Sequence, residues 1–114
     1  MGDIFTRKFI FDHSKDHISD ALGLNEKRRD EIFTLLETME KRIPIASERL
    51  QHLINMEGLQ PTELIFAMYY AKMVWDFARA QKHTIPIIKK LKEDGVLPPD
   101  FPEVPGGGDS TNIR

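Results

Sequence analysis

The sequence contains no cysteine. Disulfide bonds, thiol catalysis and cysteine-based zinc sites are therefore excluded, and the composition is compatible with a reducing compartment. A signal peptide is not expected either, because the first residues lack a basic stretch followed by an apolar core. From these two absences we expect a cytoplasmic protein.

An excess of basic residues is also missing. The chain has 16 Lys and Arg against 18 Asp and Glu, so its formal net charge is −2. Proteins that bind nucleic acid usually carry clustered positive charge, because Lys and Arg must neutralise phosphates. The densest basic groups, residues 27–29 and 89–92, are flanked by acidic residues and are typical of solvated helix faces. Nucleic acid is therefore not the partner we expect.

No apolar run reaches the ~20 residues that a membrane-spanning helix needs. The most apolar stretch, residues 64–78 (LIFAMYYAKMVWDFA), is shorter and is interrupted by Lys72 and Asp76. We therefore expect no association with a membrane. A helix with so little polar surface must be almost surrounded by protein. The stretch predicts the buried centre of an all-α domain, in a helix that opens with Pro61.

The second pattern is a heptad repeat of apolar residues that continues across a proline. Its members alternate in spacing between four and three residues: Ile32, Leu36, Met39, Ile43, Ala46, Leu50 and Leu53. Pro44 lies inside the pattern, and proline removes a backbone hydrogen bond and clashes with the preceding turn. The segment is therefore either one kinked helix over residues 25–57 or two helices. Because the repeat keeps its phase across Pro44, we favour a long kinked helix.

Capping residues predict two shorter helices. Asp12 and Gly23 can bound a first helix over residues 13–22. A last helix over residues 85–94 follows Thr84, which is a suitable N-cap. The chain thus has the pattern of a small bundle of about four helices.

The two ends of the chain differ from this helical pattern. Residues 1–11 are aromatic and partly alternating, and we expect an extended arm there, because a lone strand has no sheet to join. Residues 98–114 are rich in proline and glycine and predict a flexible tail. The helical domain is expected to cover residues 1–97.

Groups that could carry chemistry are few. His13 and His17 are four residues apart, which is a spacing that suits metal binding. Structural zinc needs four ligands, however, and neither an HExxH motif nor a third nearby histidine is present. These two residues are only weak candidates, and we predict no metal site. No nucleophile, base and orienting group can be matched either, so we predict no catalytic residues, no cofactor and no enzyme activity.

A helix-turn-helix unit at about residues 50–67 is the alternative that the sequence leaves open. A turn with Gly58 separates two helical patterns there, as in DNA-binding proteins. The start of the second helix should carry polar or basic residues to read DNA. The chain has these residues instead: Gln60, Pro61, Thr62, Ile65 and Phe66. A DNA-binding transcriptional regulator is therefore the second choice.

The central helix has one narrow polar strip, at 100° per residue. The strip consists of Ile65, Tyr69, Lys72, Asp76, Arg79 and His83. Ile65 and Tyr69 would be exposed on it in a monomer, and tyrosine is enriched at protein interfaces. We therefore predict a protein–protein interaction module, a small adaptor, regulator or inhibitor that forms a homodimer. The predicted partner-binding residues are Ile65, Tyr69, Lys72 and Asp76.

Overall fold

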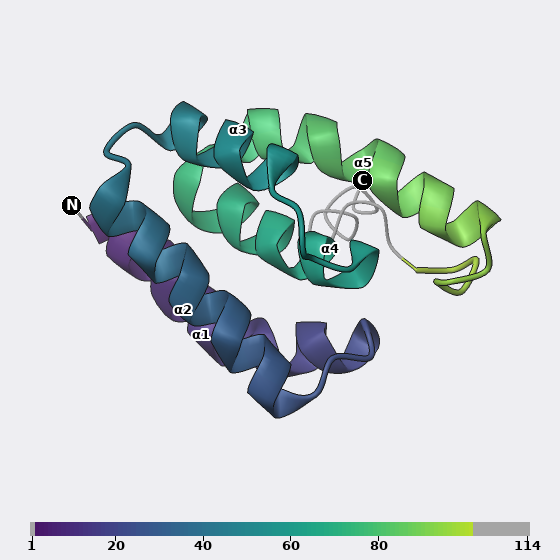
Figure 1. The fold of residues 1–114 in the computed structure, drawn as a ribbon. Helices are drawn as coiled ribbons and strands as arrows, with labels where there is room; N and C mark the ends of the chain where they lie inside the picture. The colour runs from purple at the N-terminus through teal and green to yellow at the C-terminus, as the bar shows by residue number, and fades with distance from the viewer. Residues whose placement is uncertain (1, 102–114) are drawn as a thin grey trace, which may run out of the picture.

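The structure is a computed structural model that describes the backbone of residues 2–101 and the side chains of residues 11–101. Within this range the protein is all-α, as the sequence predicts, with five α-helices, one π-helical turn and no strand (Figure 1). In chain order the elements are α1 (Gly2–Ala21), α2 (Glu26–Arg42), α3 (Ala46–Asn55), α4 (Pro61–Tyr70), η1 (Ala71–Trp75) and α5 (Phe77–Glu93).

The segment formed by α4 and η1 is the centre of the fold. It contacts each of the other described helices, and α5 folds back along α4 (Figure 1). Every residue from Ile65 to Ala71 is at most 4% exposed. The prediction of a buried central helix is confirmed, because a segment that is apolar on nearly all sides is stable in water only when other helices cover it.

The start of α4 shows how its sequence specifies a helix. Pro61 occupies the first helical position, where its missing N–H costs no hydrogen bond. The Gln60 N–H donates to the Glu63 carboxylate at 2.9 Å, which completes one half of a capping box. Asn25 similarly caps α2 by accepting a hydrogen bond from the Arg28 N–H at 2.8 Å.

The expectation of one kinked helix over residues 25–57 is wrong. Helix α2 ends at Arg42, Ile43 is extended, and α3 begins only at Ala46. A residue before proline is disfavoured in the helical region, which stops the helix ahead of Pro44. The Arg49 guanidinium donates to the carbonyls of Ile43 and Pro44, at 2.7 and 3.1 Å, and so satisfies groups that the break leaves without helical partners. The heptad repeat nevertheless still marks the core on both sides of the break.

The expectation of an extended arm at residues 1–11 is also wrong for the described part. Residues 2–11 are helical and continue into the predicted helix at 13–22, so Asp12 lies inside α1 instead of capping it. A helix satisfies its own backbone hydrogen bonds, which a lone extended segment does not. Phe11 is fully buried and its ring packs edge-on against Tyr70, with centroids 5.0 Å apart. Gly23, with φ of 79°, follows the end of this helix.

The last helix is longer than its capping residues predict. Helix α5 begins at Phe77, and Thr84 lies inside it with its hydroxyl donating to the Ala80 carbonyl at 2.6 Å. Pro86 is also inside the helix, where it is exposed. Beyond α5, Phe101 is buried against the core, so residues 98–101 do not behave as a free tail. The rest of the predicted tail, 102–114, lies outside the described residues.

Candidate functional site

The predicted polar strip is mostly covered. Ile65, Tyr69 and Lys72 are 0%, 4% and 6% exposed, so the expectation that this strip faces solvent is wrong for them. The reason is that the helix does not run straight on to Ala78. The chain turns at Asp76, and α5 then packs along the strip that a continuous helix would have left open. Asp76 is partly exposed, and its predicted role in partner binding stays a prediction.

A π-helical turn forms the junction between the two helices. The Asp76 N–H donates to the Ala71 carbonyl at 3.0 Å, five residues back, and Asp76 then has an extended backbone. Its carboxylate caps α5 by accepting a hydrogen bond from the Arg79 N–H at 3.1 Å. π-Helical turns are rare and are found frequently at functional sites. The side chains of this turn are therefore the first place to look for one.

Lys72 lies on this turn and is the most unusual polar residue of the described chain. Its Nζ is buried and has no hydrogen-bond partner within residues 11–101. The atom lies 5.7 Å from the centroid of the Tyr69 ring and 5.6 Å from that of the Phe77 ring. Burial lowers the pKa of Lys72 to about 8, because the charged ammonium loses its hydration.

The Tyr69 hydroxyl is a second buried polar group of this kind. It is buried without a hydrogen-bond partner among the described residues, and burial raises the pKa of the phenol. The third residue of the group, Phe77, is 46% exposed and is one of the few large apolar side chains that reach solvent in residues 11–101. Tyr69, Lys72 and Phe77 thus combine two unsatisfied polar atoms with an aromatic ring at the surface. We call these three residues the Lys72 site.

Next to this turn, a carboxylate ties the helices together. Glu40 of α2 accepts hydrogen bonds from the Tyr70 hydroxyl at 2.6 Å and from the Trp75 Nε1 at 2.9 Å. The Arg49 guanidinium lies over the Trp75 ring, 5.3 Å from its centroid. Burial, followed by the hydrogen bond to Glu40, raises the pKa of Tyr70. This cluster fixes the positions of α2, α3, α4 and η1, and the sequence patterns did not reveal it.

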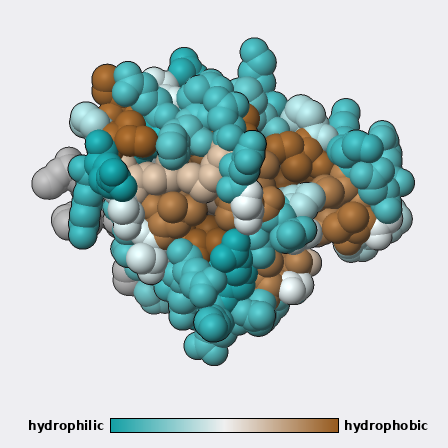
Figure 2. Space-filling model, in the orientation of Figure 1, coloured by the Kyte–Doolittle hydropathy of each residue, from teal (hydrophilic) through white to brown (hydrophobic). Residues whose placement is uncertain are grey.

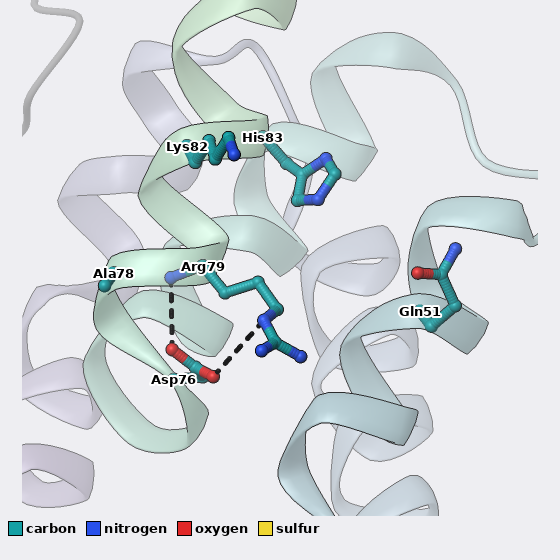
Figure 3. A pocket seen from close by; sticks show the side chains of 6 residues that line it. All are labelled: Gln51, Asp76, Ala78, Arg79, Lys82 and His83. Atoms are coloured by element: carbon teal, nitrogen blue, oxygen red, sulfur yellow. Dashed lines mark hydrogen bonds and ion pairs between the residues drawn. The ribbon is translucent and has the colours of Figure 1, made fainter.

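Two hollows open on the surface near these helices. The first, between α3 and the start of α5, has a volume of about 500 Å³ and is shown in Figure 3. Its lining residues are Gln51, Asp76, Ala78, Arg79, Lys82 and His83. The Arg79 side chain extends toward α3 (Figure 3). Its Nε lies 3.8 Å from Oδ2 of Asp76, so this carboxylate offsets part of the positive charge that lines the hollow.

The second hollow lies in the corner where α2 and α3 meet, and we call it the α2–α3 hollow. It measures about 320 Å³ and is lined by Leu35, Thr38, Met39, Arg42, Ile43 and His52. Ile45, which lies in the loop between the two helices two residues after Ile43, is 52% exposed. Figure 2 shows hydrophobic surface in several places on this face, one of them at the upper left, where Figure 1 places the loop between α2 and α3. The sequence places Ile43 in the heptad repeat but does not indicate that the next isoleucine is exposed.

The other sequence-based candidates gain little from the structure. His13 and His17 are both exposed on α1, and the described residues contain no group of three or more side chains suited to hold a metal ion. The predicted helix-turn-helix corresponds to α3 and α4, but the residues of α4 from Ile65 to Tyr70 are buried in the core. None of the helices in residues 2–101 combines the length and apolar character that crossing a bilayer requires.

Comparison with other proteins adds no further assignment. No protein-family model, curated protein or solved structure matches this chain. The inferences below therefore depend on the geometry of this molecule alone.

Proposed function

We propose that the protein is a non-enzymatic protein–protein interaction module of the cytoplasm, a small adaptor, regulator or inhibitor, and that it works as a homodimer. The observation that carries this proposal is the exposed Ile45, which follows Ile43 of the α2–α3 hollow by two residues. An exposed apolar side chain close in the chain to a recess that is lined in part by Leu35, Met39 and Ile43 makes this surface self-complementary. A two-fold rotation can place the Ile45 of each copy in the recess of the other, as isologous interfaces require.

The loop that carries Ile45 is held in a defined position. Pro44 restricts the backbone on one side, and the two hydrogen bonds from Arg49 fix the carbonyls that precede Ile45. A restrained loop loses little conformational entropy when it docks. Fully burying an exposed isoleucine side chain contributes about 1.5–3 kcal/mol, so burying the exposed half of Ile45 contributes about half of that in each of the two copies.

The charges that flank Ile45 support the same arrangement. Arg42 lies three residues before it and Glu48 three residues after it, and both are exposed. Neither forms an ion pair within residues 2–101. With a two-fold axis close to Ile45, Arg42 of one copy faces Glu48 of the other. Opposite charges in this position would set the orientation of the two subunits.

Charge reversal tests this arrangement. Arg42→Glu and Glu48→Arg should each weaken self-association, because each places like charges opposite one another. The double variant should regain a large part of the loss, since its charges are again complementary. Molar mass by light scattering across a protein concentration series measures all three variants. Two single variants that associate like the unmodified protein would overturn this orientation.

The burial of α4 argues against the DNA-binding alternative. A recognition helix must present its side chains to the major groove. In this fold the corresponding helix is the most buried element, and Phe66 and Ile65 are fully covered. We therefore do not propose DNA binding.

A further inference from the structure

The Lys72 site combines burial with missing partners in a way that the fold alone does not require. Lysine is almost never fully buried unless it is paired. Lys72 is only 6% exposed, yet its Nζ finds no oxygen acceptor within residues 11–101, and the hydroxyl of Tyr69, whose ring lies 5.7 Å from Nζ, also has no hydrogen-bond partner there. A buried polar group without a partner reduces the stability of the folded state. Such a group is explained if a ligand completes its hydrogen bonds.

The chemistry of the missing ligand follows from the donors present. The lysine ammonium has three N–H donors and no acceptor, and the tyrosine hydroxyl can donate one further hydrogen bond. A group that accepts several hydrogen bonds and carries negative charge would satisfy both. A metal ion does not bind next to the ammonium group, because both are positively charged. The site therefore fits an anion.

The surroundings narrow the class of anion further. Nζ lies over the Tyr69 and Phe77 rings at cation–π distance, and the bodies of these rings make its surroundings largely apolar. Phosphate groups are usually held by several arginines or by backbone N–H groups at a helix N-terminus. The Lys72 site offers one ammonium and one hydroxyl instead. A ligand with one carboxylate on an apolar body fits this site. The carboxylate matches the single ammonium and the hydroxyl, and the apolar body matches the aromatic side chains.

Phe77 gives such a ligand a route to the amine. It is the first residue of α5, it follows the extended Asp76, and nearly half of its surface is exposed. A side chain that is packed on one side only can rotate without disturbing the core. Rotation of this ring away from Lys72 would uncover the buried Nζ.

We propose that Lys72 and Tyr69 form a binding site for the carboxylate of a small organic acid with an apolar body, and that the Phe77 ring covers this site when it is empty. The site lies on η1 and the flanking helices, whereas the proposed dimer surface is at the corner of α2 and α3. The two proposals are therefore independent.

Benzoate and hexanoate are suitable probes, and benzamide is the neutral control with nearly the shape of benzoate. Titration followed by amide chemical shifts should show saturable binding of both acids, with shifts centred on residues 69–77. Benzamide should bind about tenfold or more weakly, which is the loss expected for a hydrogen bond to a charged group. Lack of saturable binding by both acids, or equal binding of benzamide, would overturn the proposal.

Lys72→Met tests the role of the amine without depending on a fragile variant. It removes a buried charge and keeps an unbranched side chain as long as the apolar stem of lysine, so the fold should persist. Benzoate affinity should fall about tenfold or more. Lys82→Met removes an exposed lysine from α5 and serves as the matched control, which should keep the unmodified affinity. Unchanged benzoate binding in Lys72→Met would contradict the assignment.

A carboxylate could also come from an acidic side chain of another protein. A blocked glutamate dipeptide distinguishes the two sources when it is titrated beside benzoate and hexanoate. The small-acid assignment predicts that both free acids bind more tightly than the dipeptide. Tighter binding of the dipeptide than of both acids would overturn that assignment.

Discussion

The Arg28 guanidinium and the Glu63 carboxylate form two parallel hydrogen bonds, Nε to Oε2 at 2.8 Å and Nη2 to Oε1 at 2.9 Å. This pair joins the first turn of α2 to the first turn of α4, although the residues are 35 positions apart. The hydrogen bond from Arg28 lowers the pKa of Glu63, and the bonds to Glu63 and Glu31 raise that of Arg28. The pair therefore aligns the central helix with the α1–α2 half of the fold.

Arg28→Ala should reduce the free energy of unfolding by about 1–2 kcal/mol at pH 7, because a bidentate pair is lost and the nearly buried Glu63 carboxylate keeps only its capping bond. The folded-state pKa of Glu63 is lowered, so the stabilisation is present above the ordinary pKa near 4.5 and is lost as the pH falls through the folded value. Denaturant unfolding at several pH values between neutral and acidic measures both effects.

Glu31→Gln is the control for this prediction. Glu31 also binds Arg28, with Nη1 to Oε1 at 3.0 Å, but its side chain is about half exposed. Its loss should cost less than about 0.5 kcal/mol. Equal losses from Arg28→Ala and Glu31→Gln would show that the bidentate pair contributes no more than a surface contact.

Lys72→Met should raise the free energy of unfolding by about 1–3 kcal/mol at pH 7, because it removes a buried ammonium that has no hydrogen-bond partner within residues 11–101. The folded pKa of about 8 lies below the ordinary value of 10.5. Between these values Lys72 is protonated in the unfolded chain and neutral in the folded chain. The unmodified protein therefore gains stability as the pH rises. The advantage of the variant should therefore shrink between pH 8 and pH 10.5.

Chemical denaturation of the unmodified protein, Lys72→Met and the exposed-site control Lys82→Met measures this trend, because the other titrating groups cancel in the difference. A constant difference across this range would mean that the pKa of Lys72 is ordinary. A loss of stability in Lys72→Met would mean that the ammonium contributes favourable contacts.

Glu40→Ala should cost about 2 kcal/mol, because the hydroxyl of the fully buried Tyr70 and the indole N–H of Trp75 both lose their acceptor. Trp75 is the single tryptophan of the chain, so its fluorescence reports the change directly. Glu37→Ala, one turn earlier on α2, serves as the control because Glu37 forms no hydrogen bond within residues 2–101. Equal stability and fluorescence in both variants would contradict the role of Glu40.

The sequence predicts the centre of this fold because composition alone decides it. A segment such as residues 64–71 has no face that is stable in water, so it must be buried whatever the topology. The heptad repeat predicts the buried sides of α2 and α3 for the same reason, since Ile32, Leu36 and Leu53 are all covered. A local signal also places the start of the central helix at Pro61 correctly, whereas the predicted caps Asp12 and Thr84 lie inside helices.

The path of the chain between these segments was not predictable from periodicity. A heptad repeat that continues in register across Pro44 is compatible with two separate helices. Each helix can turn its own apolar residues toward the same core, even though a loop interrupts the helical backbone between them. The turn at Asp76 is decided by a capping bond to Arg79 and by the packing of α5 on α4. The predicted strip depended on a straight helix, and this is why Tyr69 and Lys72 are buried instead of exposed.

One feature of the candidate site did have a signal in the sequence. Lys72 is the one basic residue in the most apolar stretch of the chain, and a buried lysine is the direct result of burying that stretch. The sequence had no such signal for the exposed position of Ile45. Its exposure depends on the conformation of the loop after Pro44, which periodicity does not predict.

The most direct test of the proposed homodimer is the molar mass of Ile45→Asp by light scattering, from low to high micromolar protein. Val96→Asp is the matched control, because Val96 and Ile45 are 53% and 52% exposed. The account predicts that the unmodified protein and Val96→Asp approach twice the monomer mass of 13.2 kDa, whereas Ile45→Asp stays monomeric. A monomeric unmodified protein at every concentration, or a dimer that Ile45→Asp leaves intact, would contradict it.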